Sequence, residues 1–119
     1  MPVDSAKVGA GISPERRTEV FAAISAGLQH TNAEVRHASA NAARGFPEGF
    51  GRWKSAFLEL LKDSDSHACF EALAALMLRP DDAEVRVAVR RFAEDGKIGE
   101  RNRQFAQTIL DSWEKTIDR

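Results

Sequence analysis

Residues 79–86 read RPDDAEVR, and the proline in this stretch indicates the fold. The last four letters also occur at residues 33–36, fifty positions earlier. The prolines are spaced more regularly, since three of them recur every thirty-three positions and each precedes an acidic residue: Pro14, Pro47 and Pro80. Proline suits the first turn of a helix, where its missing N–H costs nothing, and an acidic side chain complements the positive helix end. Each proline therefore predicts a helix start, and their equal spacing predicts an internal repeat with this period.

Side-chain periodicity predicts two helices in the first repeat, which is long enough to hold both. The apolar stripe of the first helix has a spacing of four residues and consists of Val20, Ile24 and Leu28. Thr31 and Glu34 then form a capping-box pattern that opens a second helix. The stripe predicted to be buried on this second helix is Val35, Ala38 and Ala42.

The later repeats show the same organisation. The apolar positions of the third helix are Trp53, Phe57, Leu60 and Leu61. Ser64 or Asp65 caps a fourth helix, which is apolar almost all round over residues 68–77. Asp81 and Glu84 cap a fifth helix, and the inward positions of this helix are Val85, Ala88, Val89 and Phe92. A sixth helix starts at about Gly99, and its apolar stripe is Phe105, Ile109, Trp113 and Thr116.

No stretch alternates strictly between apolar and polar residues, as a half-buried strand would. The sequence therefore predicts an all-α fold of six helices in three antiparallel pairs, stacked as a short right-handed α-solenoid. The units 14–46, 47–79 and 80–119 form a single domain over residues 13–119, and residues 1–12 form a flexible tail. An irregular six-helix bundle is the alternative.

The overall composition is that of one globular domain. The chain has 119 residues and a formal net charge of −1, from 17 basic and 18 acidic residues. This balance argues against a nucleic-acid or anionic-membrane binder, which needs a basic surplus. A lone cysteine, Cys69, excludes an internal disulfide framework and fits a reducing compartment, so we expect a cytoplasmic protein. The longest apolar run, over residues 72–78, is too short to cross a membrane.

One stretch carries a family pattern. Residues 32–42, NAEVRHASANA, have an Asn turn before Val-Arg and then alanines that let helices approach closely. This pattern resembles the second helix of a HEAT repeat, of the compact kind common in bacteria. Residues 63–76 resemble it less, because Cys69 occupies the arginine position. Tetratricopeptide repeats, of about 34 residues, are the alternative; Trp53 suits their pattern, but their Gly and Tyr positions hold other residues.

The candidate catalytic and metal-binding residues do not form a recognisable site. His67 and Glu71 have the i, i+4 spacing of zinc ligands, but a zinc site needs three or four ligands, and the neighbouring carboxylates suit helix caps. Cys69 and His67 point about 200° apart on one helix, so they cannot form a nucleophile–base pair. We expect a buried, inert thiol at Cys69. The sequence thus predicts no enzyme, no cofactor and no bound metal.

The resemblance implies a binding face, because the second helices of such repeats line the concave surface of the solenoid. Residues at corresponding positions of the three second helices make up the face predicted to contact a partner protein: His37, Asn41, Arg44, Phe70, Met77, Arg103 and Gln107. Two interpretations of the apolar fourth helix remain open. Either its neighbours bury it wholly, or Phe70 and Met77 form an exposed apolar floor with a polar rim, which is typical of a protein interface.

The fifth helix offers a second candidate surface, a basic face formed by Arg86, Arg90 and Arg91. Acidic residues are interleaved with these arginines along the third unit. One interpretation is a solvated face with many ion pairs, and the other is a docking site for an acidic protein or a phosphate group.

These observations predict a non-catalytic module that binds another protein through the second, fourth and sixth helices, for example as an inhibitor or an immunity protein. One alternative is an accessory subunit of a lyase or a chaperone-like helper, as implied by the HEAT-like proteins that assist chromophore attachment. Another is a homodimer that hides the apolar patch of the fourth helix. The sequence leaves open whether the chain is a monomer or a homodimer.

Overall fold

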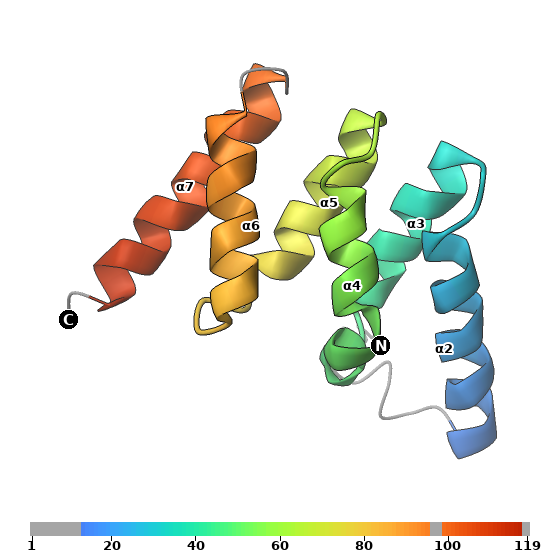
Figure 1. Cartoon of the computed structure of the whole chain (residues 1–119). Helices are drawn as coiled ribbons and strands as arrows, with labels where there is room; N and C mark the ends of the chain where they lie inside the picture. The colour runs from blue at the N-terminus through green and yellow to red at the C-terminus, as the bar shows by residue number, and fades with distance from the viewer. Residues whose placement is uncertain (1–12, 96–98, 118–119) are drawn as a thin grey trace, which may run out of the picture.

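The computed structural model describes residues 13–95 and 99–117, so the tail predicted over residues 1–12 lies outside the described part of the chain. Within these residues the elements are helical and no strand is present, which confirms the all-α prediction. The elements, in chain order, are α2 (Pro14–Leu28), α3 (Ala33–Ala43), the 3-10 helix η1 (Pro47–Gly49), α4 (Phe50–Leu60), α5 (Ser66–Leu76), α6 (Ala83–Glu94) and α7 (Glu100–Ile117) (Figure 1).

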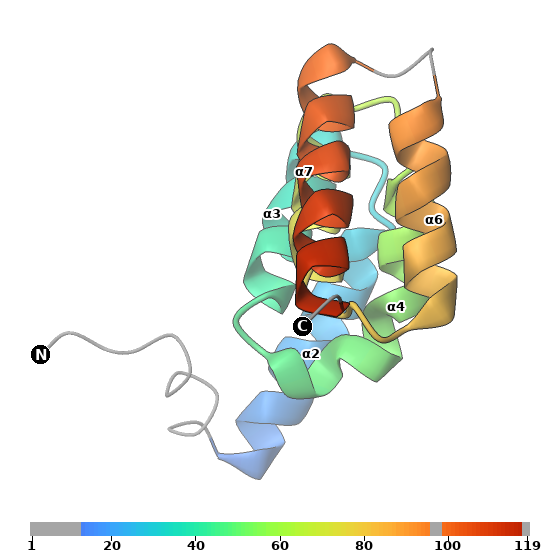
Figure 2. The same cartoon turned by 90° about the vertical axis from the view of Figure 1, so that its left-hand side faces the viewer.

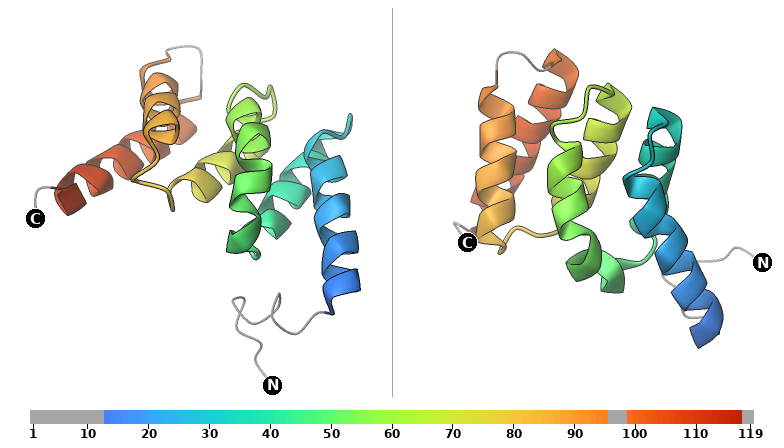
Figure 3. Two further views of the ribbon diagram at one scale, coloured as in Figure 1. Left: turned by 60° about the horizontal axis from the view of Figure 1, so that its bottom comes forward. Right: turned by 45° about the vertical axis from the view of Figure 1, so that its right-hand side comes forward.

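The helices lie in two layers. In the right-hand view of Figure 3, α2, α4 and α6 stand side by side, and α3, α5 and α7 lie behind them. Figure 2 shows the same two rows along the length of the molecule. Helices that follow one another in the chain pack together, α2 with α3, α4 with α5 and α6 with α7. Between these pairs, α3 packs closely on α5, whereas α5 and α7 touch over a smaller area.

Three helices begin at an acidic or amide side chain that caps a backbone N–H. The side chains of Asn32, Asp65 and Asp82 accept from an N–H two or three residues later, at 2.8, 3.2 and 3.1 Å. All three have the extended backbone that an N-cap requires. Of the two caps predicted for α5, Ser64 or Asp65, Asp65 is the one that the structure shows. The caps predicted at Thr31 and Asp81 are wrong by one residue, because the next residue in each case has the side chain that reaches the open N–H groups.

The three evenly spaced prolines have different local roles. Pro14 is the first residue of α2, as predicted, and Pro47 opens the 3-10 helix that leads into α4. The helix start predicted at Pro80 is wrong, since α6 begins three residues later, at Ala83. Here the N–H of Asp82 donates to the carbonyl of Arg79 at 3.3 Å, which makes Pro80 the second residue of a turn. Proline is favoured at this position of a turn for the same fixed φ that suits a helix start.

The core lies between the two layers and is centred on α4 and α5. Its largest fully buried side chains are Trp53, Phe57, Leu73, Leu76, Val85 and Val89. The two indole N–H groups find partners, because Trp53 Nε1 donates to Ser25 Oγ at 2.8 Å and Trp113 Nε1 donates to the carbonyl of Met77 at 3.0 Å. Each tryptophan therefore joins its own helix pair to the preceding one, and neither leaves a polar group unsatisfied inside the protein.

The buried stripe predicted for α3 is wrong. Ala40 and Ala43 are buried, whereas Ala38 and Ala42 are exposed and line, together with half-buried Val35, an open groove at the α2–α3 end of the molecule. No other described helix lies beyond α2 and α3 at this end (Figure 1). Alanines occur on several sides of α3, so its periodicity does not select the side that packs against α5.

Candidate functional site

The predicted partner-binding residues lie on the three helices of one layer. His37 and Asn41 are on α3 and Arg44 is its C-cap, Phe70 is on α5 and Met77 is its C-cap, and Arg103 and Gln107 are on α7. Residues at corresponding positions of the repeats are therefore brought onto neighbouring helices.

The apolar part of this face is exposed. The exposed fraction is 39% for Phe70 and 37% for Met77, although the rest of α5 is mostly buried. Leu73 and Ala74, which lie between them in the sequence, are inside the protein. The interpretation of α5 as wholly buried is therefore wrong, and its exposed floor consists of Phe70 and Met77 alone. Helix α7 contacts both residues only in part, through the Phe105 ring on Phe70 and the Trp113 indole on the Met77 carbonyl, and the rest of each side chain stays exposed.

A row of four rings crosses the face from α3 to α7. The imidazoles of His37 and His67 stack with their centroids 4.1 Å apart. His67 meets the edge of Phe70 at 6.5 Å, and Phe70 stacks on Phe105 at 5.1 Å. His67 and Phe105 are absent from the predicted face, and the signal for His67 is its position three residues before Phe70 on the same helix. This ring row holds the Phe70 side chain in place from both sides.

A buried carboxylate joins the polar residues of the face. Glu71 has an exposed fraction of 5%, and its Oε2 accepts from Arg44 Nη1 at 2.9 Å and from Asn41 Nδ2 at 3.2 Å. His67 Nε2 lies 3.9 Å from its other oxygen. Asn41 and Arg44 are therefore engaged in holding α3 against α5, as well as lining the face. Glu71 is a functional candidate that the sequence signals only as an isolated acid in an otherwise apolar helix.

His37 links the face to the start of α5. Its Nδ1 lies 3.2 Å from Oδ2 of Asp65, the residue that caps this helix. The hydrogen bond from His37, together with the backbone N–H groups at the helix start, holds the pKa of Asp65 below its ordinary value. The carboxylate of Asp65 is thus charged at neutral pH, where it both caps α5 and orients the first imidazole of the ring row.

Arg103 and Gln107 form the α7 side of the face. Gln107 is exposed and its Nε2 donates to Asp111 Oδ1 at 3.0 Å. Arg103 is half-buried, and its guanidinium makes no hydrogen bond or ion pair with a side chain of the described residues. A cation in this position is available to a partner.

Cys69 lies on the opposite side of α5, inside the protein. Its thiol donates to the carbonyl of Asp63 at 3.1 Å and lies 3.7 Å from that of Leu61. Burial raises the pKa of the Cys69 thiol to about 11, so the nucleophilic thiolate is scarce at neutral pH. The expectation of a buried cysteine is confirmed. Among the described residues, no three His, Cys, Asp or Glu side chains converge in a way that could hold a metal ion.

The arginines of the predicted basic face lie on α6. Arg90 and Arg91 are exposed and Arg86 is half-buried. None of the three forms an ion pair within the part of the chain that the structure describes. Two acidic residues near them in the sequence, Asp82 and Glu84, bind Lys54 at 2.8 and 2.9 Å.

Comparison of the chain with protein-family models, with curated proteins and with solved structures finds no match. No helix within the described ranges is long and apolar enough to span a bilayer. The geometry of the α3–α5–α7 face is therefore the main guide to function. It offers an apolar floor, fixed rings and hydrogen-bonding side chains, which are the elements of a protein-binding surface.

Proposed function

We propose that this chain is a non-catalytic, cytoplasmic protein-binding module, built as a HEAT-like α-solenoid of three antiparallel helix pairs with a right-handed stack. Three observations support this architecture: the two layers of helices, the packing of consecutive helices in pairs, and the equal sequence spacing of equivalent positions on α3, α5 and α7. The face formed by these three helices binds a partner protein.

The exposed floor of Phe70 and Met77 is the observation that carries this proposal. More than a third of each side chain is exposed, within a rim of polar residues. Covering the remaining apolar area would contribute about 1 kcal/mol for each residue. The rings of His67 and Phe105 already fix Phe70, so little side-chain entropy is lost on binding. Arg103 and Gln107 then provide hydrogen bonds at the edge of the contact.

A matched pair of substitutions tests the face. Phe70→Asp places a charge on the floor, and Val87→Asp places the same charge on α6, where Val87 is 49% exposed. We expect Val87→Asp to retain the partner captured by the wild-type protein and Phe70→Asp to lose at least about tenfold in affinity, a loss of about 1.4 kcal/mol. Quantitative affinity capture from the native host, with circular dichroism to verify folding, makes the measurement. Equal capture by both variants would remove this face from the proposal.

The same floor also favours self-association, which makes a homodimer the second candidate. Sedimentation of the purified chain distinguishes the two, because a dimer that dissociates on Phe70→Asp substitution would assign the face to a second copy. If the captured partner is an enzyme, an assay of that enzyme with and without the chain separates an inhibitor or immunity protein from an accessory subunit or a chaperone-like helper.

A further inference from the structure

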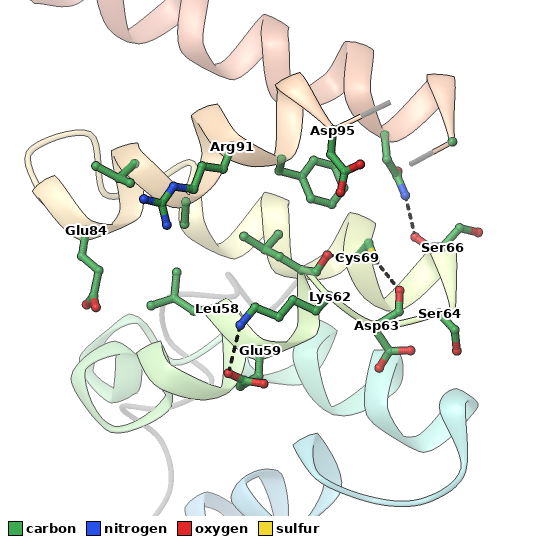
Figure 4. A pocket seen from close by; sticks show the side chains of 16 residues that line it. Leu58, Glu59, Lys62, Asp63, Ser64, Ser66, Cys69, Glu84, Arg91 and Asp95 are labelled. Carbon is green, nitrogen blue, oxygen red and sulfur yellow. Dashed lines mark hydrogen bonds and ion pairs between the residues drawn. The ribbon is translucent and has the colours of Figure 1, made fainter. Parts of the chain in front are cut away.

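Two hollows lie where neighbouring helix pairs meet, and they differ in charge. The larger one is a cleft of about 760 Å³ between the α4–α5 turn and α6, with Cys69 at its inner end (Figure 4). Figure 4 shows carboxylates and cations around this cleft, among them Asp63, Lys62 and Arg91. Charges of both signs do not select a ligand, so the cleft indicates no particular occupant.

The smaller hollow is a pocket at the first junction, where the α2–α3 pair meets the α4–α5 pair, beside η1 (Figure 1). Its volume is about 190 Å³. Sites for whole small molecules have about 300–1,000 Å³, so this pocket suits a single side chain. All the residues that line it belong to the described range 43–79. Its apolar walls come from three helices and the segment before η1, and they include Ala43, Phe46, Phe50, Phe57, Ala75 and Leu78.

The walls of this pocket are held in place by contacts within the protein. The rings of Phe50 and Phe57 lie 5.9 Å apart between centroids. The Arg79 guanidinium lies over the Phe50 ring, 4.3 Å from its centroid, and its Nη2 donates to the Pro47 carbonyl at 3.1 Å. Because the rings and the guanidinium already have fixed positions, a ligand that enters the pocket orders few side chains.

The two polar residues that line the pocket are both cations. Arg44 binds the buried carboxylate of Glu71 at 2.9 Å, so its charge is already paired. Arg79 makes no ion pair with the described residues, and its hydrogen bond to Pro47 uses one of its several N–H donors. No acidic residue lines the pocket. Apolar walls beside an unpaired guanidinium complement a ligand that joins an apolar group to a negative charge.

The small size of the pocket requires that this negative charge lie close to the apolar group. In an extended segment, the side chains of adjacent residues point in opposite directions, which would keep a neighbouring acidic side chain away from Arg79. The last residue of a chain has its own α-carboxylate beside its side chain. A guanidinium can bind such a carboxylate through two parallel hydrogen bonds, which makes a C-terminal residue the better fit.

We propose that this pocket binds the C-terminal residue of a partner protein. A large apolar side chain, such as that of leucine, enters the pocket between Phe46, Phe57 and Ala75, and the α-carboxylate pairs with Arg79. The pocket adjoins the α3–α5–α7 face at Arg44 but does not use the Phe70 floor. The proposal therefore goes beyond the binding face and does not depend on it.

Titration of the full chain with short peptides, followed by amide chemical shifts, tests the pocket. The probe is acetyl-Gly-Gly-Leu with a free carboxylate. One control is the same peptide with a C-terminal amide, and the other is acetyl-Gly-Gly-Ala with a free carboxylate. We expect saturable shifts at Phe46, Ala75 and Arg79 with the probe, and affinity weaker by about tenfold with each control.

Three results of this titration would overturn the proposal: no saturation with the probe, equal affinity for the acid and the amide, or equal affinity for the leucine and alanine peptides. Tighter binding of acetyl-Gly-Leu-Gly-Asp-Gly-amide than of the probe would overturn the assignment to a chain end, because this peptide offers the same two groups within a chain.

A matched pair of substitutions tests the role of Arg79. Arg79→Gln should weaken binding of the acid peptide by about tenfold and leave that of the amide peptide unchanged, so that the two peptides bind equally. A merely structural role of Arg79 would weaken both peptides alike. Arg90→Gln removes the same charge from an exposed position of α6 and should change neither affinity. Equal effects of the two substitutions on the acid peptide would contradict the proposed ion pair.

Ala75→Leu tests the apolar part of the pocket. Ala75 is 5% exposed and lines the pocket from α5, so a larger side chain there occupies the space that the ligand needs. We expect this variant to lose binding of the acid peptide, and a folded variant that still binds it would count against the pocket. If Ala75→Leu does not fold, the comparison of Arg79→Gln with Arg90→Gln still decides.

Two further measurements separate the pocket from other interactions. Phe70→Asp should bind the acid peptide as tightly as the wild-type protein, and a loss in this folded variant would show that the pocket is not a separate site. Sedimentation with and without the acid peptide identifies a second copy as occupant. A dimer that the peptide dissociates would overturn the assignment of the pocket to a partner protein.

Discussion

The two junctions between helix pairs are held by different kinds of contact. At the first junction two ion pairs cross from α3 and its C-terminal cap to the second pair, made by Arg36 with Asp63 and by Arg44 with Glu71. The His37 imidazole also lies 3.2 Å from the Asp65 carboxylate. At the second junction α5 and α7 are connected by neutral groups: Asn102 Nδ2 donates to the carbonyl of Ser66 at 2.9 Å, Trp113 donates to that of Met77, and Phe70 stacks on Phe105. The charged contacts of the second junction lie in the other layer, that of α2, α4 and α6, where Lys54 binds Asp82 and Glu84.

This difference originates in a few equivalent positions. Arg36, Cys69 and Asn102 follow one another at intervals of 33 positions. The side chains of Arg36 and Cys69 are directed at turns between helices, and that of Asn102 at the first residue of α5. The long arginine closes the first junction, whereas the short thiol leaves a cleft at the second. The helix pairs are thus similar, while the length of a single side chain decides how closely neighbouring pairs are joined.

The largest expected effect compares the two tryptophans. Trp53→Ala removes a fully buried side chain near the first junction and should lower the free energy of unfolding by about 3–5 kcal/mol. The backbone amides of all helices should then be less protected against hydrogen exchange. Trp113→Ala removes an equally large side chain from α7, which has few neighbours besides α6, so its effect should be confined to the third pair. Urea unfolding combined with hydrogen exchange makes the comparison. Uniform loss of protection in both variants would show that the two junctions are equally strong.

A smaller effect concerns acid sensitivity of the first junction. The hydrogen bonds from Arg36 hold the pKa of Asp63 below its ordinary value of 3.8. Because the unfolded chain binds the proton more readily, Asp63 stabilises the fold above about pH 4, and this contribution is lost as the pH falls through the lower folded pKa. Arg36→Ala should therefore lower the urea midpoint of unfolding at about pH 6. Between about pH 6 and about pH 3 the midpoint of this variant should fall less than that of the wild-type protein.

The matched control for this measurement is Arg17→Ala, which removes an exposed pair with Glu48 at 2.8 Å. Exposed pairs contribute little, so this variant should follow the wild-type pH dependence. If the two variants have the same pH profile, Asp63 is not the group whose protonation weakens the junction.

The smallest effect tests the hydrogen bond of Trp53. Ser25→Ala removes the acceptor of the indole N–H and should lower the free energy of unfolding by about 1 kcal/mol. Thr108→Ala is the control, because its hydroxyl donates to the Gln104 carbonyl on an exposed side of α7. Thermal unfolding of both variants provides the measurement, and an unchanged melting temperature for Ser25→Ala would mean that water replaces the serine.

Local chemistry in the sequence accounts for most of the secondary structure. Apolar residues at helical spacing, acidic or amide caps and the absence of alternation are sufficient to predict six helices, because helix formation depends on neighbours within a few residues. The error at Pro80 has a local cause as well, since a fixed φ suits both a turn and a helix start. The repeat spacing also places Phe70 and Met77 on the same layer as His37 and Arg103.

Only the tertiary structure decides what surrounds each of these residues. Ala38 is exposed and Ala40 is buried because α5 covers one side of α3, which no periodicity of alanines reveals. The burial of Glu71 depends on Arg44, a residue 27 positions away, and the cleft beside Cys69 depends on where α6 lies. Helix identity follows from short-range preferences that the sequence states directly, whereas exposure and pairing follow from contacts between helices far apart in the chain.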